Sequence, residues 1–315
     1  DLHPRVRRQR QMCIRDSDTT APIITLAGEN TVYVQNGENY TEAGYTAQDG
    51  CDGDITDRVT VSGDVDTSTA GSYILTYEVK DSSGNEASMQ RTVRVYAPVQ
   101  VNTVDPGNKV VYLTFDDGPG PYTAQLLDVL DKYNVKATFF VTNTRPDYRT
   151  MIAEEAKRGH TVAIHSASHV YSQIYQSEDA YFADLEEMNQ IIIEQTGQGA
   201  QIIRFPGGSS NTVSAKYSRG IMSRLVKDVE ARGFLYCDWN VSSGDAGSRP
   251  ISTQQVVQNV TEGMQKNNVS IVLRHDIKEF SVNAVEQIIQ WGLAEGYTFL
   301  PLSTSSPMSH HGVNN

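Results

Sequence analysis

The sequence is poor in cysteine, and it lacks both a long apolar run and an excess of basic charge. Three cysteines occur in 315 residues, and the spacing of Cys13, Cys51 and Cys237 matches no metal-binding or disulfide pattern. No segment reaches the roughly 20 apolar residues of a membrane-spanning helix. The net charge of −12 disfavours binding to nucleic-acid phosphates. A disulfide framework, a membrane span and a nucleic-acid partner are therefore not predicted.

The rest of the composition is typical of a folded chain with room for two domains. Apolar residues make up 38% of the sequence and aromatic residues 8%, which suits packed cores rather than disorder. The acidic excess is uneven, because residues 18–97 carry 13 Asp and Glu against four Lys and Arg. Two segments of different character are expected.

The first 17 residues match neither of these segments. They carry five Arg and show no apolar periodicity. This stretch resembles translated cloning or sequencing-adapter sequence, so we predict that residues 1–17 are unstructured and non-native. A genuine basic linker is the alternative. The chain begins at Asp1 rather than Met, so we expect the natural N-terminus, with any signal or anchor, to be missing from this sequence.

Residues 18–97 predict a small all-β domain. Short runs of alternating apolar and polar residues recur between turn signals such as Asn36-Gly37 and Asp52-Gly53. The expected strands are 23–26, 31–34, 59–61, 72–79 and 90–96. Strands at this spacing are typical of an immunoglobulin-like β-sandwich.

Beyond an extended linker at 98–108, the pattern changes to strands that alternate with helices. This alternation over residues 109–302 favours an α/β barrel or a doubly wound sheet. The expected strands are 109–114, 137–141, 161–164, 201–205, 234–236, 270–273 and 297–300. The expected helices are 122–132, 147–158, 178–195, 215–231, 253–266 and 281–295. Residues 303–315, rich in Ser, His and Asn, predict a disordered tail.

Residues able to do chemistry gather at the carboxyl ends of these strands, where barrels and open α/β sheets build their sites. They are Asp116, Asp117, His165, His169, Arg204, Asp245 and His275. Two adjacent carboxylates after a buried strand repel each other and need a compensating charge. A divalent metal held by one Asp and two His at i, i+4 spacing would supply it and leave the other Asp free as a base.

Taken singly, each of these residues has a simpler interpretation. Asp-Asp-Gly-Pro can be a solvated turn, and Arg204 an ordinary salt-bridge residue. Asp245 can be a turn residue, and His275 a helix-capping residue or a fourth metal ligand. The alignment of all of them on one edge of the sheet favours a common site.

Five segments resemble the five motifs of the polysaccharide deacetylases, which share the NodB homology domain and form carbohydrate esterase family 4. They occur in the family's order: Thr114–Pro119 (TFDDGP), His165–His169 (HxxxH), Arg204–Gly208 (RFPGG), Trp239–Asp245 (WNVSSGD) and Leu273–His275 (LxH). The resemblance covers residues 109–302 and implies a distorted (β/α) barrel.

The resemblance also implies a metal centre and a base. Asp117, His165 and His169 would ligate a divalent metal, with Zn²⁺ expected first and Co²⁺ or Ni²⁺ as alternatives. Asp116 would be the general base that activates the attacking water. Arg204 would pair with Asp116 and keep it ionised.

The remaining motif residues take the other implied roles. His275 would protonate the departing amine, and Asp245 would orient its imidazole. The backbone N–H of Gly207 would stabilise the oxyanion, and Leu273 would line the pocket for the acetyl methyl group.

The sequence departs from the family pattern at two positions. Many members carry Tyr where this chain has Gly207, and Trp where it has Ala246. Both changes are expected to open the cleft and leave the preferred glycan undecided. Trp239, Tyr122 and Tyr171 are candidates to stack on a sugar instead.

The function implied is a metal-dependent hydrolase that removes N-acetyl groups from GlcNAc-type sugars, with peptidoglycan expected first and chitin-type chains second. An acetylxylan esterase and an inactive cell-wall-binding protein are the alternatives. A two-His, one-carboxylate iron oxygenase is disfavoured by the α/β pattern and the HxxxH spacing. The expected location is extracellular or attached to the cell wall.

Residues 18–97 in turn resemble bacterial immunoglobulin-like modules of the DUF5011 type. The matching segments are 21–26, 40–45, 52–56, 71–77 and 81–85. Such modules are non-catalytic spacers or adhesion units, so a contact with the cell surface is expected. An acidic loop around Asp49 and Asp52 could bind Ca²⁺, but it lacks the spacing of a helix–loop–helix site. A solvated charge run is the alternative.

Overall fold

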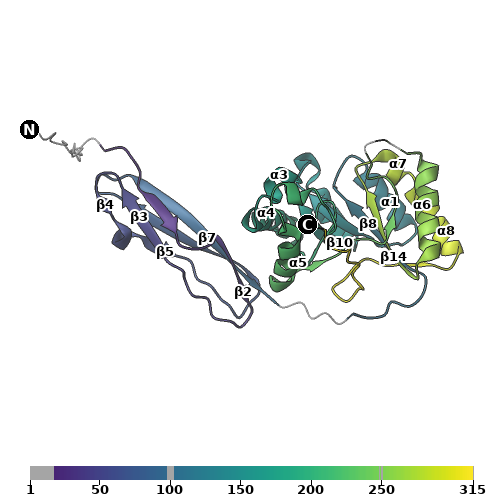
Figure 1. Ribbon diagram of the computed structural model, residues 1–315, viewed down its shortest axis with the longest axis horizontal. Helices are drawn as coiled ribbons and strands as arrows, with labels where there is room; N and C mark the ends of the chain where they lie inside the picture. Colours follow the sequence, from purple (N-terminus) through teal and green to yellow (C-terminus); the bar gives the residue numbers. More distant parts are fainter. Residues whose placement is uncertain (1–17, 98–102, 248, 250, 315) are drawn as a thin grey trace, which may run out of the picture. The chain divides into compact units, whose positions relative to one another are not determined.

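The computed structural model describes residues 18–97, 103–247, 249 and 251–314 (Figure 1). Its contacts divide the chain into two compact units, one ending at Pro98 and the other starting at Val99. The predicted non-native segment 1–17 and the first part of the predicted linker lie outside the described residues. The second part, residues 103–108, contains no helix or strand. No helix within the described ranges is long and apolar enough to cross a membrane.

The N-terminal unit is a sandwich of two sheets. Its strands are β1 (Ile23–Leu26), β2 (Thr31–Gln35), β3 (Tyr45–Asp49), β4 (Gly53–Asp54), β5 (Thr60–Ser62), β6 (Gly71–Lys80) and β7 (Glu86–Tyr96), with a 3₁₀ turn at Thr56–Arg58. One sheet has the order β1-β3-β4 and the other β2-β7-β6-β5. Residues from both sheets, among them Ile24, Ala47 and Tyr77, form one apolar core. The predicted sandwich is confirmed, and β3 and β4 are additional strands with little apolar signal.

The acidic loop of this unit uses its carboxylates to hold turns. Asp49 accepts hydrogen bonds from the backbone N–H groups of Cys51 and Asp52 at 2.8 and 2.7 Å. Asp52 forms an ion pair with Arg58 at 2.8 Å. Asp49 is buried and Asp52 is paired, so these two carboxylates hold turns and do not form the solvated charge run of the alternative. Cys237 is buried and free, and Cys13 lies outside the described residues.

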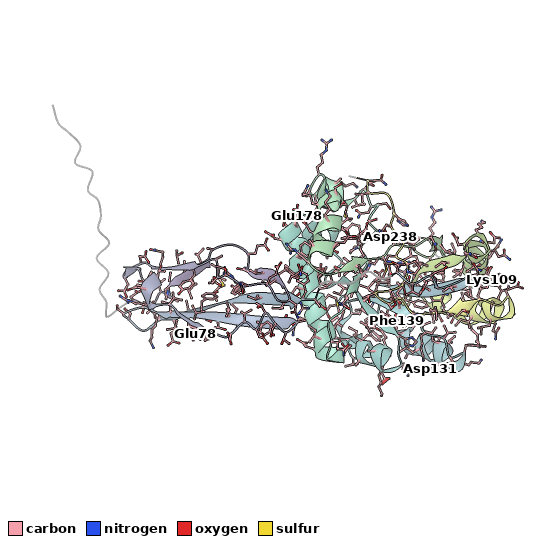
Figure 2. The ribbon with its side chains drawn as sticks, turned by 90° about the horizontal axis from the view of Figure 1, so that it is seen from below. Glu78, Lys109, Asp131, Phe139, Glu178 and Asp238 are labelled. Atoms are coloured by element: carbon pink, nitrogen blue, oxygen red, sulfur yellow. The ribbon has the colours of Figure 1, made fainter. Side chains whose placement is uncertain are left out.

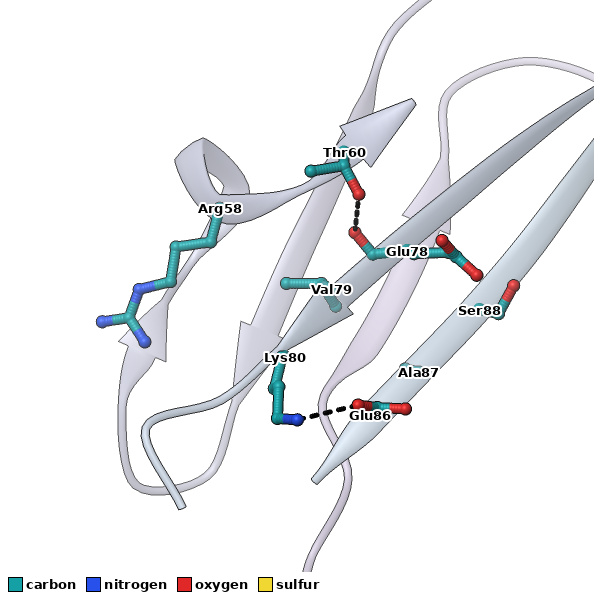
Figure 3. Close-up of a pocket in the computed structure, with 8 residues that line it drawn as sticks. All are labelled: Arg58, Thr60, Glu78, Val79, Lys80, Glu86, Ala87 and Ser88. Carbon is teal, nitrogen blue, oxygen red and sulfur yellow. Dashed lines mark hydrogen bonds and ion pairs between the residues drawn. The ribbon is translucent and has the colours of Figure 1, made fainter. Parts of the chain in front are cut away.

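A shallow pocket on the N-terminal unit is lined by β5, β6 and β7 (Figure 3). Lys80 and Glu86 neutralise each other there across 2.8 Å, and the Thr60 hydroxyl donates to the Glu78 carbonyl at 3.3 Å.

The C-terminal unit is built around a parallel sheet. Its strands are β8 (Val110–Asp116), β9 (Thr138–Thr142), β10 (Thr161–Ser166), β11 (Ile202–Ile203), β12 (Leu235–Tyr236), β13 (Val241–Ser242), β14 (Val269–His275) and β15 (Thr298–Phe299). The order is β12-β11-β10-β9-β8-β14-β13, with β15 paired to β8, and all pairs are parallel. No pairing in the described part of the chain joins β12 to β13. This open barrel confirms the predicted distorted (β/α) barrel.

Helices flank this sheet on both sides, as Figure 1 shows for α4 and α5 on one side and α6 and α8 on the other. The helices are α1 (Thr123–Lys132), α2 (Met151–Lys157), α3 (Tyr171–Ile174), α4 (Glu178–Thr196), α5 (Ile221–Ala231), α6 (Thr253–Lys266), α7 (Glu279–Val282) and α8 (Val285–Ala294), with 3₁₀ turns at Pro146–Tyr148 and Ser214–Lys216. In Figure 2 Phe139 of β9 lies inside the unit, while Asp131 and Glu178 lie at its periphery. Helix α4 begins at a Ser177 cap and ends at Gly197, whose φ is 80°.

The parallel arrangement brings the carboxyl ends of the strands to one edge. Asp116 is the last residue of β8 rather than the residue after it, and it lies opposite His275, the last residue of β14. Ile164 of β10 lies opposite Ile203, which precedes Arg204. The pairing of the strands by itself therefore brings the predicted site residues close together.

The C-terminal segment 303–314 packs against the barrel instead of fraying. The backbone N–H of Asp238 donates to the Ser309 carbonyl at 2.7 Å, and the His310 ring stacks on Tyr236 with centroids 4.0 Å apart. Ser306 is buried. The composition of this segment predicted disorder because it contains few apolar residues. Hydrogen bonds and ring stacking, rather than a hydrophobic face, attach the segment to the barrel.

The packing of the helices yields a stability prediction with a matched control. Leu127 on α1 is fully buried, whereas Leu293 on α8 is 46% exposed. Leu127→Ala should lower the free energy of unfolding by about 2–5 kcal/mol, since it removes buried methyl groups and leaves a cavity. Leu293→Ala should change it by less than about 0.5 kcal/mol. Urea unfolding of both variants measures the difference, and equal losses would contradict the assigned packing.

Candidate metal centre and active site

The centre of the site is the buried side chain of Arg204, which follows β11. Its Nη1 donates to Asp116 Oδ1 and to Thr114 Oγ1, both at 2.7 Å. Nε donates to the Cys237 carbonyl at 2.8 Å, and Nη2 to the Asp238 carbonyl at 2.9 Å. The guanidinium also lies over the Phe140 ring, 4.0 Å from its centroid. This charge is therefore desolvated but fully partnered, as a buried ion requires.

Arg204 also determines which ring nitrogen of His165 carries the proton. The carbonyl oxygen of Arg204 lies 2.8 Å from His165 Nδ1. A carbonyl can only accept, so Nδ1 carries the proton and Nε2 presents a lone pair. That tautomer is the one in which Nε2 can bind a metal.

The side chains of Asp117, His165 and His169 bring three possible metal-ligand atoms close together. Asp117 Oδ1 lies 3.5 Å from His165 Nε2 and 3.4 Å from His169 Nε2, and the ligand atoms all lie within 4.8 Å of one another. Asp117 Oδ1 is buried and receives no hydrogen bond from any described residue. A buried anionic oxygen without a donor, facing two imidazoles, fits a divalent cation with one carboxylate and two His ligands.

The protonation states and backbone conformations of Asp117 and His169 both suit metal binding. Burial alone would raise the pKa of Asp117, but the three neighbouring histidines and Arg145 outweigh it and lower the pKa. Burial lowers the pKa of His169, so its imidazole is neutral at neutral pH. Asp117 and His169 have φ angles of 70° and 55°, a left-handed conformation that costs non-glycine residues about 1–2 kcal/mol. Such strain is typical of functional positions.

The Asp116 side chain is held by a different partner from that of Asp117. Its Oδ1 is held by Arg204, and its Oδ2 lies 4.0 Å from His165 Nε2. The two adjacent carboxylates thus have different partners. One oxygen of Asp116 remains available next to the candidate metal ligands.

His275, the last residue of β14, forms a hydrogen-bonded pair with Asp245 of the loop that follows β13. His275 Nδ1 lies 2.8 Å from Asp245 Oδ1, and the His275 backbone N–H donates to Asp245 Oδ2 at 2.9 Å. Ser281 Oγ donates to the same Oδ2 at 2.6 Å. His275 Nε2 is left 3.8 Å from Asp117 Oδ2. The imidazole therefore turns its free nitrogen toward the candidate metal ligand Asp117.

The electrostatics of this pair favour a protonated imidazole. Burial lowers the pKa of His275, but the hydrogen bond and charge of Asp245 outweigh it and raise the pKa. Burial likewise opposes ionisation of Asp245, and the bond to His275 holds its pKa far below the usual range. A charged imidazole with a fixed orientation can serve as a general acid.

The residues predicted to contact the substrate lie around this centre. Gly207 has a φ of 79°, and its N–H donates to no group within the described ranges. Leu273 is buried on β14, two positions before His275 and so on the same face of the strand. Trp239 is half-buried, with its ring centroid 5.7 Å from the Arg204 guanidinium carbon.

Two supporting carboxylates were missed by the sequence interpretation. Asp184 of α4 accepts from Ser166 Oγ at 2.6 Å and from the N–H groups of Ala167 and Ser168 at 2.9 and 2.8 Å. It therefore holds the loop between the two histidine ligands. Nothing in its helical setting marked it in the sequence.

Asp238 supports the loop that carries Gly207. Its Oδ1 accepts from the Ser209 N–H at 2.9 Å, and its Oδ2 accepts from Ser209 Oγ at 2.5 Å and from the His311 N–H at 2.8 Å. Its carbonyl also accepts from Arg204. Asp238 follows a predicted strand, so the strand-end rule could have found it. The contribution of His311, from the segment predicted to be disordered, could not be found that way.

Asp276 is a third buried carboxylate beside the site. It accepts a short hydrogen bond from Thr123 Oγ1, and burial raises its pKa to about 7. A Cβ atom at Gly118 would lie 2.3 Å from both of its oxygens. Glycine is therefore required in the Asp-Asp-Gly-Pro turn because no side chain fits against Asp276.

Comparison with known proteins matches both units to family models. Residues 103–222 match the model described as "Polysaccharide deacetylase", and residues 24–95 match "Bacterial surface protein, Ig-like domain". The chain is 32% identical over 197 residues to the putative polysaccharide deacetylase YheN of Bacillus subtilis, covering 61% of this chain and 67% of that protein. It is 33% identical over 196 residues to a peptidoglycan-N-acetylglucosamine deacetylase of Bacillus cereus, covering 61% and 68%.

Solved structures give the same result. The catalytic domain of a peptidoglycan N-acetylglucosamine deacetylase from Eubacterium rectale is 78% identical, with a TM-score of 0.68, covering 68% of this chain and 97% of that one. The polysaccharide deacetylase Bc1974 from Bacillus cereus is 32% identical, with a TM-score of 0.55, covering 65% and 96%. Both resemblances seen in the sequence are confirmed.

The geometry of the triad predicts the effect of removing a ligand. Asp117→Asn and His169→Ala should each weaken Zn²⁺ binding by more than about 100-fold, which exceeds the usual effect of losing a supporting group. Titration calorimetry of metal-stripped protein measures the affinity without depending on activity. Asp147→Asn, which alters an exposed carboxylate, is the control and should bind as the unaltered protein does. Unchanged affinity in both ligand variants would contradict the site.

Proposed function

This chain belongs to the polysaccharide deacetylase family, and on that premise we propose that it is a metal-dependent hydrolase that removes N-acetyl groups from GlcNAc-type sugars. The observation that carries the proposal is the meeting of three groups at one edge of the sheet. They are the Asp117–His165–His169 triad, the Arg204-paired Asp116 and the Asp245-paired His275. Together they supply a cation site, a base and an acid.

A divalent ion, with Zn²⁺ proposed first, would polarise the acetamide carbonyl and lower the pKa of water. Asp116 accepts the proton of the attacking water on Oδ2, because Arg204 occupies Oδ1. The unpaired N–H of Gly207 donates to the oxygen that becomes negative as the carbonyl is attacked. This arrangement assigns the two oxygens of one carboxylate to different tasks.

Breakdown of the tetrahedral species needs a proton on nitrogen. His275 gives its Nε2 proton to the leaving amine as the C–N bond breaks, and Asp245 stabilises the imidazolium until that moment. The products are acetate and a free amino sugar. Leu273, on the same face of β14 as His275, lines the space for the acetyl methyl group.

We propose peptidoglycan as the substrate, because the Bacillus cereus relative and the Eubacterium rectale structure are both named peptidoglycan N-acetylglucosamine deacetylases. Chitin-type oligosaccharides come second. An extracellular or wall-attached location follows from that substrate. The surface-protein model that matches residues 24–95 supports a role of the N-terminal unit in contact with the cell surface.

Acetate release tests the function directly. The full chain with Zn²⁺ should release acetate from peptidoglycan fragments and chitooligosaccharides, and less from acetylxylan. Asp116→Asn should lower kcat by about 10²–10⁴-fold, the range expected for loss of a general base. Asp147→Asn should leave kcat unchanged. No release from any of the three substrates, or full activity in Asp116→Asn, would refute the proposal.

The His275–Asp245 pair predicts a shift in pH dependence. Because the acid must be protonated, kcat/KM should fall as the pH rises through the raised pKa of His275. Asp245→Asn removes the charge that raises this pKa, so the alkaline limb should move to lower pH. The acidic limb should stay in place. An alkaline limb that does not move in the pH–rate profile would exclude His275 as the acid.

A further inference from the structure

The space beside Gly207 is filled by another residue. A Cβ atom at Gly207 would lie 2.7 Å from Tyr171 Oη and 3.5 Å from its Cζ. From the sequence, Gly207 is expected to open the cleft. At this position the structure differs, since the Tyr171 hydroxyl stands where a side chain at 207 would begin.

Tyr171 is placed there by the metal-binding loop. It is the first residue of α3, two positions after the ligand His169, and the two rings meet edge to face with centroids 5.6 Å apart. On its other side its ring meets Tyr175 at 5.6 Å. Tyr175 is buried and donates from its hydroxyl to the Pro206 carbonyl at 2.8 Å. Tyr171 is therefore held between a metal ligand and the loop that carries Gly207.

The two tyrosines differ in how their hydroxyls are used. The Tyr175 hydroxyl is satisfied inside the protein, as buried tyrosines usually are. Tyr171 is half-buried, and its hydroxyl bonds to no group in the parts of the chain described. A rigid ring with a free donor lies next to the unpaired N–H of Gly207.

We infer that Tyr171 is a specificity-determining residue whose ring forms the cleft wall beside Gly207 and whose hydroxyl donates a hydrogen bond to an oxygen of the substrate's sugar ring. An aromatic face with a polar tip suits a sugar, which has both apolar faces and hydroxyl oxygens. The inference rests on the proposed function, since it requires an N-acetylated sugar at this site.

The experiment compares a substrate that contains N-acetylated sugars with one that carries an acetyl group and no sugar. Tyr171→Phe removes one oxygen and keeps the ring, so folding should be preserved. Its kcat/KM on penta-N-acetylchitopentaose should fall about 3–10-fold through a higher KM, the value of one net hydrogen bond. Hydrolysis of 4-nitrophenyl acetate, which has no sugar, should be unchanged. Tyr217→Phe, at a tyrosine that is 44% exposed, is the matched control and should behave as the unaltered chain.

Each other outcome overturns the inference. Equal rates and KM values in Tyr171→Phe and the unaltered chain on both substrates would show that the hydroxyl contacts no sugar. A parallel loss on both substrates with weaker Zn²⁺ binding would make Tyr171 a support for His169 only. If the unaltered chain hydrolyses the aryl ester but no N-acetylated sugar, the proposed function fails and this inference fails with it. Binding of the oligosaccharide in the Asp116→Asn background, with and without Tyr171→Phe, gives the same comparison without turnover.

Discussion

The ion pair between Arg204 and Asp116 is the interaction on which the rest of the site depends. The guanidinium is completely buried and donates to groups from β8 and from the segment that follows β12, while the backbone carbonyl of Arg204 sets the tautomer of His165. Removing one partner of a buried pair leaves an uncompensated charge and costs about 3–5 kcal/mol. One residue therefore joins the strand ends, the proposed base Asp116 and the candidate metal ligand His165.

This constraint explains how two adjacent carboxylates coexist at the end of a buried strand. Asp116 ends the strand in an extended conformation and turns to the arginine, whereas Asp117 adopts a φ of 70° and turns to the histidines. The backbone strain at Asp117 separates the two charges into different surroundings. Further carboxylates, Asp184 and Asp238, then fix the surrounding loops by accepting backbone N–H groups, which positions the site without adding a free charge.

The sequence was informative about the strand ends and uninformative about contacts between distant segments. Asp116, His165, Arg204 and His275 could be placed together because parallel strands of regular length bring their carboxyl ends to one edge. The two-residue strand β13 and the short helix α3 have no periodicity to read, since their positions are set by pairing with other elements. For the same reason the ordered segment 303–314 was predicted as a tail: its attachment lies in hydrogen bonds to Asp238 and stacking on Tyr236.

The two departures from the family pattern now have different meanings. Ala246 is exposed, so at this position the expectation of a more open cleft stays a prediction. At Gly207 the wall is supplied from the neighbouring element, since the Tyr171 hydroxyl reaches the place that a side chain would occupy. A tyrosine inserted at 207 would meet both the left-handed backbone and Tyr171, so the glycine and the tyrosine depend on each other. The ring of Tyr171 contacts the candidate ligand His169 directly, so the proposed substrate contact and the proposed metal geometry share one side chain.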